Sequence, residues 1–255
     1  MRGYFEEEWH GIQFSSFAKL SSSEPAGVEF YNAFYRELFQ RYRGFEDLDE
    51  AWRRRNGDKA HWIASRLPRG ARVLSVGCGL GYMERCLQRE RGGDIELHVQ
   101  DDAQDSLTWL RDELPDERIH LTRERAEQAG PFDVIYMSAV DYALPRREMI
   151  ALLSDQRAQL RDGGACLLVS SSFLPESSSV LQRVMSQGKD AAKWMLEKIG
   201  LRHRGQFWGW MRTQTEYREL MSGAGYVEVT DGFIQAPSQR SYFIEGRRPA
   251  PACSR

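Results

Sequence analysis

Cysteine is scarce in this chain, and its spacing argues against several classes of protein. The four cysteines, Cys78, Cys86, Cys166 and Cys253, are scattered and match no metal-ligand pattern. No cluster of histidine, cysteine and aspartate has ligand spacing either. A disulfide framework and a zinc module are therefore disfavoured. We expect free thiols in a reducing cytoplasm and no catalytic metal.

Long apolar runs and a net charge of one sign are also missing. No stretch approaches the 18 continuous apolar residues of a transmembrane helix. The first 20 residues carry acids at positions 6–8 and lack the apolar core of a signal peptide. Basic and acidic residues nearly cancel, with a formal net charge of −2. These features make neither a membrane nor a nucleic acid the expected partner.

The residues that are present alternate between strand-like and helix-like patterns. Apolar strand patterns occupy 72–76, 94–99, 119–121, 132–137 and 165–170, with helical spacing between them. A hairpin pair follows at 225–230 and 241–245. This order predicts an α/β fold with a doubly wound, mostly parallel seven-stranded sheet that ends in an antiparallel hairpin.

Two further segments lie outside that alternation. Residues 1–68 are rich in aromatics at roughly helical spacing and predict a helical N-terminal lid segment. Residues 69–255 form the predicted Rossmann-like domain, with a helical insertion at about 171–212. The insertion begins in a serine-rich loop and ends in Phe-Trp-Gly-Trp at 207–210.

The strongest local signal is the glycine-rich sequence Gly-Cys-Gly-Leu-Gly at 77–81. It follows a buried strand and opens a helix, and its glycines permit positive φ and close approach of a ligand to the backbone. Free amide groups at the start of the helix favour polar or anionic ligand groups. The competing interpretation is an ordinary tight turn between a strand and a helix.

The spacing of these glycines distinguishes two ligand classes. A dinucleotide site needs its third glycine at position 82, where this chain has Tyr82. The observed Gly-x-Gly-x-Gly instead resembles motif I of class I S-adenosylmethionine (SAM)-dependent methyltransferases. The resemblance covers about residues 70–170 well and the last 40 residues loosely. Gly163-Gly164 and the Gly-Ala-Gly-Tyr sequence at 223–226 resemble two turns of the same fold.

The resemblance implies SAM as the cofactor and assigns roles to matching positions. Asp101 ends the second strand, about twenty residues past the loop, where a carboxylate accepts the ribose hydroxyls. Asp102 is the adjacent alternative, and both can also be solvated turn acids. The family usually has an acid at position 75, but Ser75 supplies a hydroxyl without charge. The predicted cofactor-binding residues are Ser75, Gly77, Cys78, Gly79, Gly81, Asp101, Asp102, Met137 and Ser138.

Two residues are candidates for a base that removes a proton from the methyl acceptor. Asp141 follows the fourth strand, at the sheet edge where open α/β sheets bind ligands. Capping of the helix that Pro145 opens explains Asp141 equally well. His203 titrates in the useful range, but it lies between two arginines, as an exposed histidine would.

The acceptor pocket is expected where aromatic residues gather. Tyr31, Tyr142, Trp208 and Trp210 are the predicted substrate-binding residues, closing as a lid over the cofactor. The same aromatics can simply be core. A lid of this kind resembles those of small-molecule methyltransferases. The resemblance implies a SAM-dependent methyltransferase that modifies an oxygen or nitrogen of a small molecule, such as a metabolite, a natural product or a sugar. The alternatives are a non-catalytic SAM-binding partner subunit, an RNA methyltransferase and, least favoured because of Tyr82, a nicotinamide-dependent oxidoreductase.

Overall fold

A seven-stranded sheet forms the centre of the molecule. The computed structural model describes residues 2–176 and 205–250. The strand order is β10-β11-β8-β7-β4-β5-β6. β11 runs antiparallel to β10 and β8, and all other neighbouring strands are parallel. The predicted fold is confirmed, including the antiparallel hairpin at the end of the sheet. The strands are β4 (Arg72–Val76), β5 (Glu96–Gln100), β6 (Ile119–His120), β7 (Phe132–Ser138), β8 (Leu160–Ser170), β10 (Val227–Gln235) and β11 (Arg240–Arg247).

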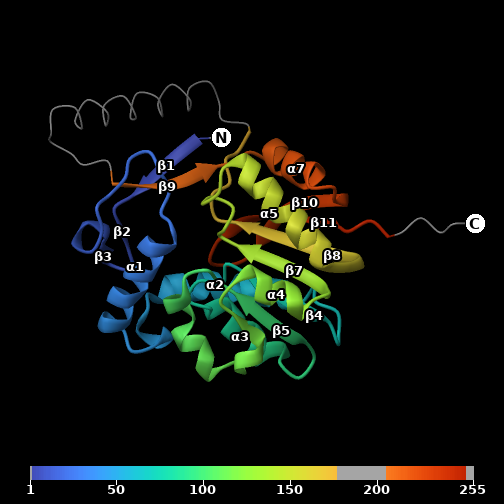
Figure 1. The fold of residues 1–255 in the computed structure, drawn as a ribbon, viewed down its shortest axis with the longest axis horizontal. Helices are drawn as coiled ribbons and strands as arrows, with labels where there is room; N and C mark the ends of the chain where they lie inside the picture. Colours follow the sequence, from blue (N-terminus) through green and yellow to red (C-terminus); the bar gives the residue numbers. More distant parts are fainter. Residues whose placement is uncertain (1, 177–204, 251–255) are drawn as a thin grey trace, which may run out of the picture.

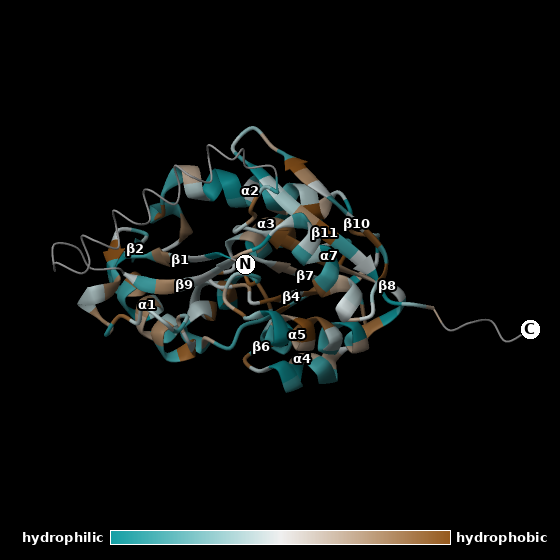
Figure 2. Ribbon diagram, turned by 90° about the horizontal axis from the view of Figure 1, so that it is seen from above, coloured by the Kyte–Doolittle hydropathy of each residue, from teal (hydrophilic) through white to brown (hydrophobic). Residues whose placement is uncertain are grey.

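Helices cover both faces of this sheet because its strands are apolar on both sides (Figure 2). In β4, for example, Val73 packs into one core cluster and Leu74 into the other. Helices α2 and α3 contribute to the first cluster, and α4, α5 and α7 contribute to the second. The helices are α1 (Val28–Arg41), α2 (Glu50–Ala64), α3 (Tyr82–Arg91), α4 (Arg123–Ala129), α5 (Arg146–Gln159) and α7 (Gln214–Gly223).

A third apolar cluster lies beside the sheet and forms a cap. It joins aromatics of the N-terminal segment, such as Phe14 and Phe34, to Tyr142 and Trp208. The predicted helices of the N-terminal segment are present as α1 and α2. Residues 2–13 are not helical, however, and include the short strands β1 (Arg2–Glu6), β2 (Glu8–Trp9) and β3 (Ile12–Gln13). A two-residue turn with positive φ at His10 and Gly11 joins β2 to β3, a geometry that favours a hairpin.

The end of the insertion also differs from the prediction. Residues 206–211 form a strand, β9 (Gln206–Met211), instead of continuing a helix, and β9 pairs antiparallel with β1 (Figure 1). Gly3 permits this pairing, since a Cβ atom there would lie 2.7 Å from the Phe207 ring. The predicted helical stretch between 177 and 204 lies outside the described residues. Within the described ranges, no helix is both long and apolar enough to cross a membrane.

Candidate active site

The glycine-rich loop joins the end of β4 to the start of α3. Its three glycines have left-handed φ angles of +66° at Gly77, +56° at Gly79 and +76° at Gly81. A Cβ atom would lie 2.4 Å from a neighbouring side chain at Gly77 and 2.0 Å from one at Gly81. At Gly79 it would meet only the Tyr35 hydroxyl, at 3.1 Å. Gly77 and Gly81 therefore pack against the protein, while Gly79 leaves room for a ligand.

A cavity of about 370 Å³ lies between this loop and the cap. The loop, the carboxyl ends of β4, β5 and β7, and the first turn of α3 form one wall. The cap and residues 142–144, which follow β7 in the chain, form the other wall. The lining includes residues 76–84, 100–103, Arg123 and 138–140 on the sheet side, and Trp9, 26–28, Tyr31, Tyr35, Trp52, Asn56 and 142–144 on the cap side.

Asp101 follows β5 and lines this cavity. Its Oδ2 atom accepts a hydrogen bond from the Gly79 amide at 2.8 Å, and its Oδ1 atom accepts one from the Ala103 amide at 2.8 Å. Burial raises the pKa of Asp101 to about 6, although the two amide donors act in the opposite direction. Each carboxylate oxygen keeps a second lone pair. Asp101 can therefore still accept hydrogen bonds from two ligand hydroxyls.

Asp102 lines the same cavity but is already engaged by side chains. Its Oδ1 atom accepts a hydrogen bond from Gln100 at 2.8 Å, and its Oδ2 atom lies 3.5 Å from an Arg123 nitrogen. The Asp102 side chain is 41% exposed. Of the two adjacent acids, Asp101 is thus the more buried, and no arginine or lysine in the described ranges pairs with it.

Ser75 is buried and does not line the cavity. Its hydroxyl donates to Oε1 of Glu84 at 2.6 Å, and the Tyr136 hydroxyl donates to the same oxygen at 2.7 Å (both hydrogen bonds are buried). Glu84 lies in the first turn of α3 and does line the cavity. Sequence reasoning missed Glu84. The available signal was an acid three residues after Gly81, in the first turn of the helix that the loop opens.

The remaining predicted cofactor residues divide between the cavity and the core. Cys78 and Ser138 line the cavity, and burial raises the pKa of the Cys78 thiol. Met137 does not line it. The Met137 side chain is fully buried in the second core cluster, because side chains alternate between the two faces of β7.

The structure does not support Asp141 as a base. Its side chain is completely buried away from the cavity lining, and its Oδ2 atom accepts hydrogen bonds from the hydroxyls of Ser170, at 2.8 Å, and Tyr217. Arg212 donates to the Asp141 carbonyl oxygen. Asp141 does not cap α5 either, since Pro145 is the N-cap residue. It anchors the segment after β7.

The other candidate base, His203, lies outside the described residues.

Two of the four predicted substrate-binding residues meet at the cavity. The hydroxyls of Tyr31, from α1, and Tyr142, from the segment after β7, lie 3.2 Å apart. Both side chains line the cavity. Burial raises the pKa of Tyr142 to about 12 and that of Tyr31 well above its ordinary value. Both tyrosines are therefore neutral hydrogen-bonding groups at physiological pH.

The two tryptophans lie elsewhere. The Trp208 ring stacks on Tyr142 with 5.8 Å between centroids and also contacts Phe14. A bulge in the β1–β9 pairing leaves Trp208 without a partner in register, and its side chain is buried in the cap. The Trp210 ring packs against Phe207 instead. Neither tryptophan lines the cavity in the described structure, so Trp208 supports the tyrosine wall from behind.

The family comparison identifies the class of protein. A family model described as a methyltransferase domain matches residues 46–230, which include the whole glycine loop and most of the sheet. The chain therefore belongs to this family of methyltransferase domains, and the family expected from the sequence is confirmed. A comparison with curated protein sequences finds no significant match.

Solved structures with the same fold have low sequence identity to this chain. Magnesium protoporphyrin IX methyltransferase from Synechocystis PCC 6803 is 16% identical, with a TM-score of 0.57 over 87% of this chain and 97% of that one. Human N-acetylserotonin methyltransferase, solved with SAM, is also 16% identical, with a TM-score of 0.54. The match covers 88% of this chain but 57% of the human chain. A putative O-methyltransferase from Nostoc punctiforme has a TM-score of 0.58 at 15% identity, over 90% of this chain and 63% of that one.

Proposed function

We propose that this protein transfers the methyl group of SAM to an oxygen or nitrogen of a neutral, aromatic small molecule. The proposal rests on the uneven distribution of charged residues over the two sides of the cavity. The charged residues of its described lining, Glu84, Asp101, Asp102 and Arg123, all belong to the sheet side. The cap side presents aromatic and uncharged residues, which suits a flat acceptor without charge.

The sheet side fits SAM. Gly79 leaves space directly at the loop backbone, and Asp101 retains lone pairs for two ribose hydroxyls. When bound, SAM would supply an activated methyl group on a positively charged sulfur. The family match and the neighbours solved with SAM or its product support this cofactor.

The cap side would orient the acceptor and exclude water. The paired hydroxyls of Tyr31 and Tyr142 can donate to and accept from an acceptor oxygen or nitrogen, but neither is a base at neutral pH, because burial raises the pKa of both. Their contribution is therefore position, which alone accounts for a large part of many rate enhancements. In this role the N-terminal segment, residues 1–68, acts as a lid.

The absence of an acid at position 75 would favour a non-catalytic SAM-binding subunit, because Ser75 provides no charge for the cofactor. The Glu84 carboxylate, however, lies 2.6 Å from the Ser75 hydroxyl and lines the cavity, which favours the catalytic function.

A cytoplasmic location agrees with the free thiols of Cys78, Cys86 and Cys166.

A paired acceptor screen tests this function. The protein is incubated with methyl-labelled SAM and with phenols or aromatic amines, each offered beside a carboxylated or phosphorylated form of the same ring. We expect the labelled methyl group to be transferred to the neutral acceptor of each pair and little of it to the charged acceptor. The Tyr142→Phe variant should keep SAM affinity and lose about three- to tenfold in turnover, the value of one hydrogen bond. Preferential labelling of charged acceptors, or of RNA, would contradict the proposal.

A further inference from the structure

Glu84 is a buried acid that has no basic side chain paired with it among the described residues. Its side chain is 2% exposed, and it lines the cavity from the first turn of α3. Its Oε1 atom accepts hydrogen bonds from the Ser75 and Tyr136 hydroxyls, both of which are neutral donors. In residues 2–176 and 205–250, no lysine, arginine or histidine forms an ion pair with it.

A buried carboxylate in this state carries an electrostatic cost. Taking it out of water is unfavourable unless a positive charge compensates it. Burial raises the pKa of Glu84 despite its two hydroxyl donors, and the nearby Asp101 carboxylate raises it further. A cationic ligand group placed beside Glu84 would remove this cost, whereas a neutral group would not.

We propose that Glu84 binds the positively charged amino group of the methionine part of SAM. The proposal rests on SAM being the cofactor, as proposed above. SAM carries two positive centres, the sulfonium and the ammonium. The ammonium has three N–H donors that suit a carboxylate, and the sulfonium has none. Glu84 thus supplies the carboxylate that position 75 lacks, from a helix instead of from a strand.

The strand register explains why the two positions are linked. Ser75 of β4 pairs directly with Tyr136 of β7, and both side chains reach the same Glu84 oxygen. A carboxylate at position 75 would place a second negative charge against Glu84 in a buried site, which like-charge repulsion disfavours. The pair of positions therefore holds one acid, and a serine at 75 complements a glutamate at 84.

The test separates the amino acid end of SAM from its sulfonium charge. S-adenosylhomocysteine keeps the amino acid end on a neutral sulfur, whereas 5′-methylthioadenosine keeps the adenine, ribose and a neutral sulfur and lacks the whole amino acid end. Affinities for SAM and for both thioethers are measured by calorimetry on the wild type, on Glu84→Gln, and on Glu90→Gln as a charge control on the exposed side of α3. Glutamine can still accept hydrogen bonds from both hydroxyls, so Glu84→Gln removes charge more than shape.

We expect Glu84→Gln to weaken the binding of SAM and of S-adenosylhomocysteine on the order of ten- to a hundredfold. Its affinity for methylthioadenosine should stay within about twofold, the level expected without a lost charge contact. Glu90→Gln should change none of the three affinities. Equal loss of all three ligands, or of none, would show that Glu84 is only a structural residue, and loss of SAM alone would place Glu84 against the sulfonium; either outcome would overturn the proposal.

A relocation variant gives an independent answer if Glu84→Gln does not fold. Ser75→Asp combined with Glu84→Ser moves the acid back to the strand and keeps one carboxylate and one hydroxyl in the site. We expect it to discriminate SAM from methylthioadenosine as the wild type does, while Glu84→Ser alone does not. Loss of discrimination in the relocation variant would count against the proposal. Failure of the wild type to bind either ligand would instead refute the proposed function.

Discussion

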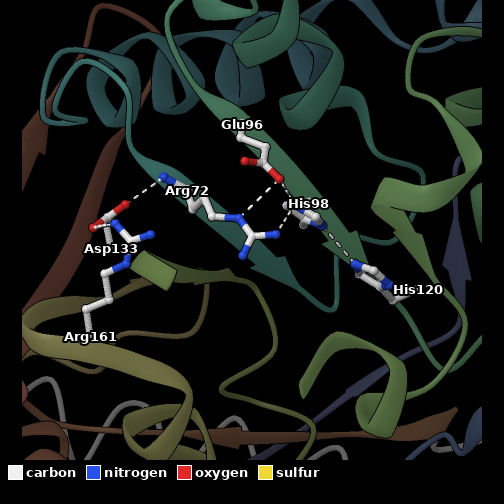
Figure 3. A network of polar contacts seen from close by, with 6 residues as sticks. All are labelled: Arg72, Glu96, His98, His120, Asp133 and Arg161. Carbon is white, nitrogen blue, oxygen red and sulfur yellow. Dashed lines mark hydrogen bonds and ion pairs between the residues drawn. The ribbon is translucent and has the colours of Figure 1, made fainter. Parts of the chain in front are cut away.

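The two edges of the central sheet hold their acids in opposite electrostatic settings. At the amino edge, where β4, β5 and β7 begin, Glu96 forms an ion pair with Arg72 at 3.1 Å (Figure 3). Asp133 accepts the Arg72 backbone amide at 2.8 Å and pairs with Arg161 at 2.8 Å. Every acid drawn in that network has a cation beside it.

At the carboxyl edge Asp102 lies beside Arg123, but Asp101 and Glu84 have no cation paired with them within the described chain. Asp101 accepts two backbone amides, and Glu84 accepts two hydroxyls. Both carboxylates have raised pKa values because burial disfavours their charged forms. Paired acids at one edge stabilise the fold, and acids without cations at the other edge are available to a ligand. Asp101 and Glu84 thus mark the carboxyl edge as the ligand site independently of the glycine motif.

The largest expected effect is at the glycine loop. Gly79→Val should abolish SAM binding, because a branched Cβ would fill the space at the loop and oppose the left-handed φ. Gly163→Val is the matched control. Gly163 also has a left-handed φ, of +74°, but no atom lies within 4 Å of an added Cβ, and it lies toward the amino edge. Calorimetry should show binding retained there, and undiminished binding in Gly79→Val would remove the loop from the site.

The second effect compares neighbouring acids at the carboxyl edge. Asp101→Ala should cost about 2–3 kcal/mol of SAM binding through loss of hydrogen bonds to a charged group, roughly a thirty- to hundredfold loss in affinity. Asp102→Ala should have a much smaller effect, since Asp102 is 41% exposed and paired with Arg123. A larger loss in Asp102→Ala would mean that the register of the site is displaced by one residue.

The third prediction tests whether an acid at the amino edge contributes to stability without contributing to SAM binding. Asp133→Ala removes an acid that, like Asp101, accepts a backbone amide. It should lower the free energy of unfolding by about 1–3 kcal/mol, because the Arg72 amide and Arg161 lose their acceptor. SAM affinity should stay unchanged. Chemical denaturation and calorimetry on the same samples check both parts, and a large loss of affinity would show that the two edges are coupled.

What the sequence could predict was the part of the site that is local in the chain. The glycine loop, its flanking strand and helix, and Asp101 at the end of the next strand lie within about one βαβ unit, where periodicity and glycine placement carry the signal. The signal for helix α7 (Gln214–Gly223) is equally local, since Thr213 caps it with a capping box. The hairpin strands at the end of the sheet were equally local.

What the sequence could not predict depends on contacts between distant segments. β1 pairs with β9 across about two hundred residues, so neither the strand at 2–6 nor the position of Trp208 could be inferred from local pattern. The role of Asp141 depended on Ser170 and Tyr217, which only the folded chain brings together. Glu84 was missed because its importance arises from the cross-strand pair of Ser75 and Tyr136.

The smallest expected effect is a pH dependence of stability that differs in sign between a buried histidine pair and Asp101. His98, in the middle of β5, and His120, the last residue of β6, lie 3.0 Å apart, and burial lowers the pKa of both, to about 4 for His120 (Figure 3). The unfolded chain, with histidine pKa near 6.5, binds protons first as pH falls. The histidines therefore contribute stability above about pH 6.5 that is lost progressively toward pH 4.

Asp101 should act in the opposite direction. Its folded pKa of about 6 lies above the unfolded value near 3.9, so the folded state takes up the proton first and gains stability as pH falls from 6 to 4. We expect urea unfolding of the protein without ligand to show a weaker loss on acidification in His120→Gln and a stronger loss in Asp101→Asn than in the wild type. SAM affinity should fall through pH 6 in the wild type, because the protonated Asp101 is a poorer acceptor. If both variants shift the pH profile in the same direction, the opposite signs assigned to the histidine pair and to Asp101 are wrong.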